Sequence, residues 1–144
     1  MLFFSMQIRR STKIIYPELS YKINGIFFEV HNKLGRFCSE KQYNDAIEAL
    51  LKQKGLNYER EKDLNFFLKE KSIGGNRVDF CIEKKILVDS KAKRYITRED
   101  FRQMKRYLEA AGLKLGMVVN FRETSIRPRR IINSEAKETQ SANP

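Results

Sequence analysis

Apolar residues in the first third of the chain recur at the spacing of amphipathic helices. Over residues 19–34 they fall every three or four positions, and Gly35 follows. This pattern predicts a helix that ends at the glycine. Ser39 and Gln42 have the spacing of a capping box, and an apolar stripe follows them before Gly55. A second helix is therefore expected to begin after Ser39.

The pattern then changes to extended segments. Residues 56–68 alternate loosely between apolar and polar, and residues 71–76 (KSIGGN) have the composition of a turn. Short apolar runs follow over residues 77–83 and 84–92. Together these features predict a meander of three strands.

One more helix and one more strand are expected near the end of the chain. Thr97 can cap a helix whose apolar stripe stops at Gly112. The continuous apolar run LGMVVNF (115–121) is typical of a strand that is covered on both faces. The predicted order is helix, helix, three strands, helix, strand.

The length of the chain limits it to one domain. A chain of 144 residues can bury one real core and is too short for two. We expect a domain over residues 19–132, an N-terminal extension over residues 1–18, and a disordered polar tail over residues 133–144. No apolar run approaches the roughly 18 residues that span a bilayer, and the first residues lack the order of a secretory signal. We therefore expect no membrane contact and a cytoplasmic location, with Cys38 and Cys81 reduced.

The charge of the chain points to a polyanionic partner. Lys and Arg number 29 against 18 acidic residues, which gives a formal net charge of +11. A nucleic acid is favoured over a membrane surface or a merely solvated basic surface, because no strongly basic amphipathic helix stands out.

Three charged residues interrupt the apolar runs in the middle of the chain. Asp89 and Lys91 are two apart and share one face of their strand, and Asp79 stands on the preceding strand. If residues 83–85 form a three-residue loop, Asp79 lies across from Asp89, whereas a two-residue loop would place Phe80 there. Two neighbouring carboxylates repel unless a cation lies between them, and Mg²⁺ held by one or two carboxylates plus waters would remove that repulsion.

A second interpretation of the same residues is ordinary ion pairing. Lys91 could pair with Asp79 or with Asp89 on a solvated face of the sheet. The spacing D-x₉-D-x-K is by itself a weak pattern, because many basic proteins match it by chance.

Several ordered blocks together resemble the GxxExxY proteins of the PD-(D/E)XK nuclease superfamily. They are LGRFCSEKQYNDAIEALLKQKGLNYERE, RVDFCIEKKILVDSKAK and FRQMKRYLEAAGLKLGMVVNF. In the last block a Gln-x-x-x-Tyr helix, with Gln103 and Tyr107, leads through a Gly-Leu-x-Leu-Gly turn into a strand that closes with Asn120 and Phe121. The resemblance covers roughly residues 19–132.

The resemblance implies an α/β, restriction-endonuclease-like αβββαβ core with an extra N-terminal helix, in which helices flank a mixed central sheet. It also implies a divalent metal and hydrolysis of phosphodiesters. By position, Asp79 corresponds to the first motif acid, Asp89 to the acid of the second motif, and Lys91 to its lysine. Glu40 falls on the glutamate of GxxExxY, and Gln103 matches a glutamine on the helix after the motif.

Three positions depart from the family pattern. Tyr43 falls on the tyrosine of GxxExxY, but Phe37 stands where the family has its glycine. Asp89 is shorter than the glutamate that is more usual there, and Val78 replaces the proline of the superfamily name.

The expected activity is that of a metal-dependent nuclease. Mg²⁺, for which Mn²⁺ can substitute, would be held by Asp79, Asp89, the backbone carbonyl of Ser90 and, through water, Glu40. Lys91 would orient the attacking water and stabilise the developing charge. Basic residues expected to contact the phosphate backbone are Arg77, Lys93, Arg94, Lys105, Arg106 and Arg122.

The expected partner is nucleic acid, with DNA favoured over RNA, and a homodimer is one state that the resemblance allows. Two other functions stay open at this stage. The chain could be a nucleic-acid-binding module that keeps the fold without cleaving, or an interaction protein whose basic surface binds an acidic partner. Glu40, as the first residue of its helix, could equally serve only the helix dipole.

Overall fold

The computed structural model describes residues 14–138, which contain three helices and five strands. In chain order they are α2 (Pro17–Leu34), α3 (Glu40–Gln53), β1 (Tyr58–Leu68), β2 (Lys71–Ile82), β3 (Ile86–Lys91), α4 (Arg98–Ala111), β4 (Leu115–Asn120) and β5 (Arg129–Ile132). Most of the expected N-terminal extension and the end of the expected tail lie outside the described residues.

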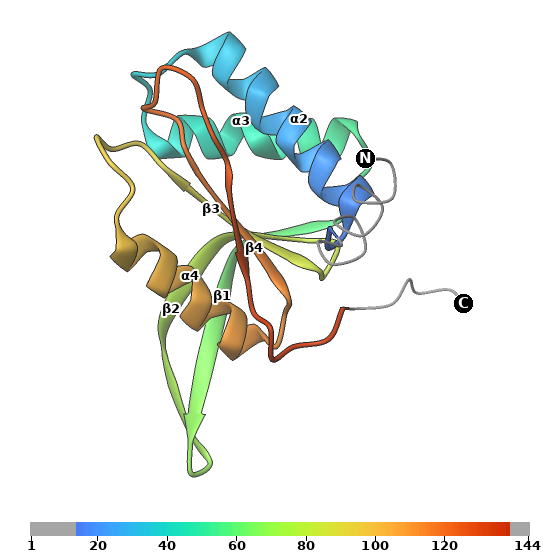
Figure 1. Ribbon diagram of the computed structural model, residues 1–144, viewed down its shortest axis with the longest axis vertical. Helices are drawn as coiled ribbons and strands as arrows, with labels where there is room; N and C mark the ends of the chain where they lie inside the picture. The colour runs from blue at the N-terminus through green and yellow to red at the C-terminus, as the bar shows by residue number, and fades with distance from the viewer. Residues whose placement is uncertain (1–13, 139–144) are drawn as a thin grey trace, which may run out of the picture.

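The five strands form one mixed sheet in the order β1-β2-β3-β4-β5. β3 and β4 are parallel, and the other neighbouring pairs are antiparallel. Helices α2 and α3 lie on one face of the sheet and α4 on the other (Figure 1). This arrangement confirms the expected α/β fold, in which helices flank a mixed sheet. β4 is buried along its whole length, as its continuous apolar sequence predicts.

The helix ends follow the capping signals. The capping boxes of Ser39 with Gln42 and of Thr97 with Asp100 are both formed. Gly35 follows α2 with a φ of 75°, and Gly112 follows α4 in the left-handed conformation, which a residue with a Cβ adopts only with strain.

The turn expected over residues 71–76 was wrong. Those residues begin β2, and the chain reverses at Lys69 and Glu70, which both have a positive φ. The two glycines, Gly74 and Gly75, lie inside β2, opposite the single residue between Leu64 and Phe66 of β1. The pairing of the two strands shifts there because β2 has one more residue than β1, which forms a β-bulge. The result is a long hairpin that extends away from the helices (Figure 1).

The fifth strand was also missed. β5 has only four residues, two of them arginines, and it forms the edge of the sheet beside β4. A short edge strand with charged side chains has little apolar signal. Asn133, the first residue of the expected tail, is buried and its backbone N–H donates to the carbonyl of Lys114 at 2.8 Å. The packed part of the chain therefore extends at least to this residue.

Two layers of core hold the fold together. One lies between the sheet and the pair α2–α3, and it includes Phe27, Tyr43, Val88 and Phe121. The other lies between the sheet and α4, and it includes Leu87, Met104 and Tyr107. Both cysteines are free, with Cys81 buried and Cys38 half-buried. Among the helices of residues 14–138, none combines the length and apolar content that a membrane crossing needs.

Candidate active site

β2 and β3 separate where the predicted acidic residues stand. The ladder between them consists of the pairs Phe80–Val88, Cys81–Leu87 and Ile82–Ile86. Residues 83–85 therefore form a three-residue connection, the first of the two alternatives that the sequence left open, and the register of a two-residue loop is excluded. Asp79 and Asp89 each lie one residue beyond the last pair of this ladder.

The carboxylate of Asp79 occupies the gap that the ending ladder leaves. Its Oδ2 accepts hydrogen bonds from the backbone N–H of Ser90 at 2.8 Å and from the Ser90 hydroxyl at 3.2 Å. The carbonyl of Lys91 points toward β4, where it accepts from the N–H of Phe121. Because carbonyls alternate in direction along a strand, the carbonyl of Ser90 points to the side of Asp79.

Asp89 and Lys91 form a largely buried ion pair. Lys91 Nζ lies 2.8 Å from Asp89 Oδ2, and only 17% of the lysine side chain and 10% of the aspartate side chain are exposed. Burial, followed by the charge of Asp79, raises the pKa of Asp89 to about 7. Burial alone would lower the pKa of Lys91, but the Asp89 carboxylate outweighs it and that pKa is raised. The alternative interpretation placed this ion pair on a solvated face of the sheet. The low exposure of both side chains contradicts that placement.

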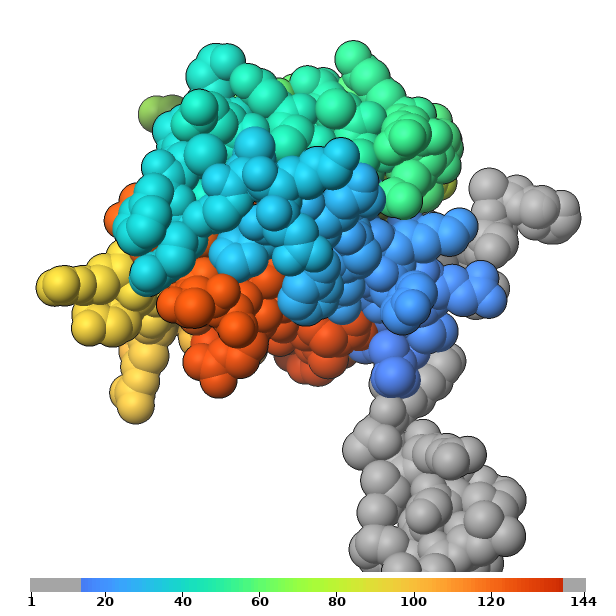
Figure 2. Space-filling view, turned by 90° about the horizontal axis from the view of Figure 1, so that it is seen from above, coloured from blue at the N-terminus to red at the C-terminus, as the bar shows by residue number. Residues whose placement is uncertain are grey.

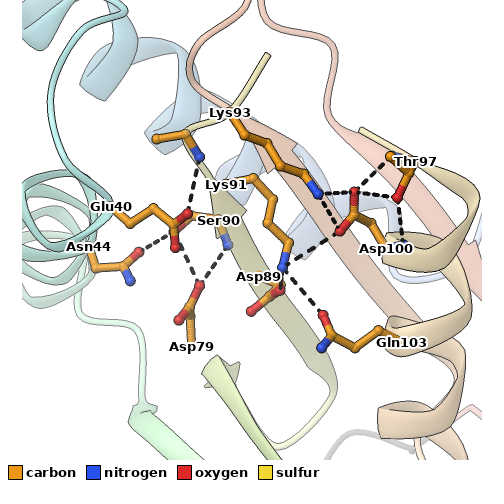
Figure 3. A network of polar contacts seen from close by, with 11 residues as sticks. Glu40, Asn44, Asp79, Asp89, Ser90, Lys91, Lys93, Thr97, Asp100 and Gln103 are labelled. Carbon is orange, nitrogen blue, oxygen red and sulfur yellow. Dashed lines mark hydrogen bonds and ion pairs between the residues drawn. The ribbon is translucent and has the colours of Figure 1, made fainter. Parts of the chain in front are cut away.

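Helix α4 holds the lysine from the other side. Lys91 Nζ donates to Gln103 Oε1 at 3.3 Å and lies 4.0 Å from Asp100 Oδ1 (Figure 3). Asp100 also binds Lys93 Nζ at 2.6 Å and the N–H of Thr97 at 2.7 Å. Burial would raise the pKa of Asp100, but the hydrogen bond from Lys93 lowers it below its usual value.

Asp100 was not among the sequence-predicted site residues. In the sequence Asp100 appears only as the last residue of the spacing Thr-x-x-Asp. A capping box accounts fully for that spacing, so nothing in it indicates a role in the site. The structure shows that the same carboxylate closes the cap of α4 and fixes two lysines of the strand end (Figure 3).

Helix α3 contributes two residues to the open edge of β3. Glu40 is exposed, and its Oε2 accepts from the N–H of Ala92 at 3.3 Å. Asn44 is buried, and its Oδ1 accepts from the Ser90 hydroxyl at 2.6 Å. Asn44 was also missed from the sequence, where it appears only as a polar residue beside an apolar stripe. Glu40 thus reaches the strand end and does more than complement the helix dipole.

The two tyrosines singled out in the sequence have structural surroundings. Tyr43 is fully buried, stacks on Phe121 with ring centroids 4.3 Å apart, and donates from its hydroxyl to the carbonyl of Gly35 at 2.6 Å. Tyr107 is buried in the core under α4, where burial and then the charge of Asp89 raise its pKa.

The basic residues expected to contact phosphates differ in their surroundings. Arg77 pairs with Asp63, Lys93 with Asp100 and Arg106 with Glu99. Arg94 is exposed near the strand end, whereas Lys105 lines a surface cavity of about 610 Å³ together with residues of the C-terminal segment. None of the carboxylates described above lines that cavity. Arg122 follows β4 and donates to the carbonyl of Arg36.

The oxygen donors at the end of β3 fit a hard divalent cation. Within residues 14–138 no three His, Cys, Asp or Glu side chains lie together as a ready-made metal cluster. Mg²⁺ does not need one, because it is usually bound by one or two carboxylates plus waters and substrate phosphates. Asp79 and Asp89 are close enough for one charge to raise the pKa of the other carboxyl, and the carbonyl of Ser90 faces the same edge.

The chain belongs to the PD-(D/E)XK nuclease superfamily. The model of that family matches residues 17–131, which include every helix and strand of the fold except the end of β5. This finding confirms the superfamily and the fold expected from the sequence, and superfamily members are generally hydrolytic nucleases that use divalent metals.

No curated protein matches the sequence. Among solved structures, one titled "Crystal structure of SSO0001" is similar, with 22% sequence identity and a TM-score of 0.49. The match covers 62% of this chain and 48% of that protein, so this chain spans about half of its length.

Proposed function

We propose that this protein is a Mg²⁺-dependent nuclease of the GxxExxY group that hydrolyses phosphodiester bonds in nucleic acid. One observation carries the proposal. Two carboxylates, Asp79 and Asp89, lie at an edge of β3 that β2 has left, and a half-buried lysine, Lys91, lies beside them. Stability alone does not account for this arrangement, because two neighbouring carboxylates, one of them buried, repel each other and Lys91 pairs directly with only one of them.

The side chains of the chain have separate tasks in the proposed reaction. Asp79 and Asp89, with the Ser90 carbonyl, would hold the cation, and Glu40 would act through water. Asp79 is already oriented by its hydrogen bonds to Ser90. Once bound, Mg²⁺ would supply positive charge at the scissile phosphate and lower the pKa of water.

Lys91 is the residue that would act on the water and the developing negative charge. Gln103 and Asp100 keep its ammonium group beside Asp89, so it needs little reorganisation when substrate arrives. The raised pKa of Lys91 means that it works as a cationic donor and not as a general base. Asn44 would act indirectly, because it fixes the hydroxyl of Ser90.

A second function rests on the same ion pair. The contact of 2.8 Å between Lys91 and Asp89 neutralises one of the two carboxylates proposed to hold the cation. A nucleic-acid-binding module that keeps the nuclease fold but no longer cleaves would retain such a contact as a purely structural pair. In that case binding would survive both EDTA and the loss of Asp89.

The test is cleavage of labelled single-stranded, duplex and branched DNA and of RNA, each in Mg²⁺, Mn²⁺ and EDTA. We expect the wild type to cleave only with metal, with DNA as the preferred substrate. Asp89→Ala and Lys91→Ala should each lose at least about 100-fold in rate, whereas Lys22→Ala on the exposed surface of α2 should not. Cleavage by either site variant at the wild-type rate would refute the proposed roles.

We further propose a cytoplasmic location, which the two free cysteines support. The homodimer stays a prediction. Light scattering on the purified chain would measure its mass directly.

A further inference from the structure

Two arginines and an exposed phenylalanine form a surface cluster beside the candidate active site. Arg36 and Phe37 follow α2, and Arg122 follows β4. Arg36 Nε donates to the carbonyl of Arg122 at 2.8 Å, and Arg122 Nε donates to the carbonyl of Arg36 at 2.9 Å. We call these three residues the Arg–Phe–Arg cluster. Figures 1 and 2 show the two segments side by side at one edge of the molecule.

The aromatic ring of the cluster is open to solvent. The guanidinium carbons of Arg36 and Arg122 lie 4.8 and 5.5 Å from the centroid of the Phe37 ring. Even so, 76% of Phe37 is exposed, so at least one face of the ring is uncovered. An exposed aromatic face that neighbouring cations hold in place is a stacking platform.

Both guanidinium groups lack an acidic partner within residues 14–138. Arg60, Arg77, Arg106 and Arg129 each contact a carboxylate, whereas the contacts of the cluster's arginines are to backbone carbonyls and to the ring. Two like charges held this close attract an anion, and a phosphate accepts from guanidinium groups particularly well.

The cluster is anchored to the strand end that carries Lys91. The N–H of Arg122 donates to Asn120 Oδ1 at 3.2 Å, and Asn120 Nδ2 donates to the carbonyl of Lys93 at 2.7 Å. On the other segment, the hydroxyl of Tyr43 accepts from the N–H of Cys38 at 3.1 Å. The platform is thus a fixed extension of the site and not a loose loop.

We infer that the Arg–Phe–Arg cluster binds an unpaired nucleotide next to the scissile phosphate, with the base stacked on Phe37 and the phosphates held by Arg36 and Arg122. This inference rests on the proposed nuclease function and specifies its substrate. Bases within a duplex are already stacked and paired, so an exposed ring can take only a base that is single-stranded, frayed or at a branch. The substrate class is therefore nucleic acid with unpaired nucleotides.

The test measures binding without cleavage, in EDTA, by fluorescence anisotropy. The probes are a single-stranded oligonucleotide in DNA and in RNA form, its duplex, and a single strand of DNA with abasic sites. Phe37→Ala should weaken binding of the two normal single strands by about 5- to 100-fold and should leave duplex and abasic binding unchanged. Phe67→Ala is the matched control, because Phe67 is 72% exposed on the distant hairpin.

The arginines should give a different signature. Arg36→Gln and Arg122→Gln should weaken binding of normal and abasic single strands alike, and each should reduce the slope of log K against log salt by about 0.7. Quenching of 2-aminopurine fluorescence in the bound wild type, lost in Phe37→Ala, would report the stacking itself.

The results separate the two proposals. Wild-type affinity in Phe37→Ala, or equal losses on normal and abasic strands, would overturn the platform even if the wild type cleaves with Mg²⁺. Base-dependent loss in Phe37→Ala would support the platform even if no metal gives cleavage, in which case the nuclease proposal fails and the binding module remains.

Discussion

The buried carboxyl of Asp89 should make the metal-free protein less stable as the pH rises. Its pKa is raised in the folded state from 3.8 to about 7, so between these values the folded state binds a proton that the unfolded state has released. Stability is therefore highest below about pH 4 as far as this group is concerned, and it falls as the pH rises toward 7. The perturbation that isolates this effect is Asp89→Asn, which keeps the shape and removes the titration.

The size of the effect follows from the shift. One proton changes the free energy of unfolding by about 1.4 kcal/mol per pH unit inside the window. Between pH 5 and pH 7 the wild type should lose about 2–3 kcal/mol relative to Asp89→Asn. The variant also removes the pair with Lys91, but Lys91 keeps its charge throughout this range because its pKa is raised, so the dependence of that pair on pH is already contained in the titration of Asp89.

The assay is urea unfolding in EDTA at pH 5, 6, 7 and 8, comparing wild type with Asp89→Asn. The control is Asp45→Asn, an exposed carboxyl whose pKa is lowered by the hydrogen bond from Lys41. Because Asp45 is ionised in both states above pH 5, that variant should keep the wild-type dependence on pH. Parallel curves for wild type and Asp89→Asn would refute the reasoning that Asp89 titrates at a strongly raised pKa.

Added Mg²⁺ extends the same experiment to the proposed function. At pH 8 and ten times its Kd, Mg²⁺ should stabilise the wild type by about 1.4 kcal/mol and should leave Asp89→Asn unchanged. Equal stabilisation of both proteins would show that Mg²⁺ binds elsewhere.

Three further predictions concern the support of the site. A Cβ at Gly116 would lie 2.5 Å from Met104 Sδ, so Gly116→Ala should lower the free energy of unfolding in urea by about 1–3 kcal/mol. In the double variant with Met104→Ala the two losses of stability should not add, and simple additivity would contradict the clash. Thr97→Ala removes the cap of α4 and should cost about 1 kcal/mol of stability; it should also slow cleavage, because Asp100 loses a partner, and an unchanged rate would argue against that role. Tyr43→Phe should lower stability by about 1 kcal/mol in thermal unfolding. It should also weaken binding of single strands, because the hydroxyl of Tyr43 holds the segment after α2 in place. Binding at the wild-type affinity would show that Tyr43 does not support the Arg–Phe–Arg cluster.

The sequence correctly predicted those features that depend only on residues close together in the chain. The capping boxes at Ser39 and Thr97 need only four neighbouring residues, and both are formed. The register of Asp79 and Asp89 was reduced to two alternatives that differ by one loop residue, because a strand alternates with a period of two, and the structure selects the three-residue loop. The turn at Lys69 was missed because residues without a turn propensity adopt a positive φ there, while the nearby glycines form the bulge.

The contacts that complete the site have no local signal. Asn44 and Ser90 are 46 residues apart, and Arg36 and Arg122 are 86 apart. Each of these residues is unremarkable within its own segment, and only the folded sheet brings them together. The same holds for Asp100, whose capping role hides its contacts with Lys91 and Lys93.

The parallel strands β3 and β4 are connected through α4, and this connection determines when the site can form during synthesis of the chain. Lys91 reaches its position only when α4 supplies Gln103 and when β4 pairs with β3 beside it. A chain still being synthesised, with β4 inside the ribosome, lacks both the second neighbour of β3 and the anchor of Arg122. On the proposed function, the site is therefore not assembled until β4 has left the ribosome and paired with β3.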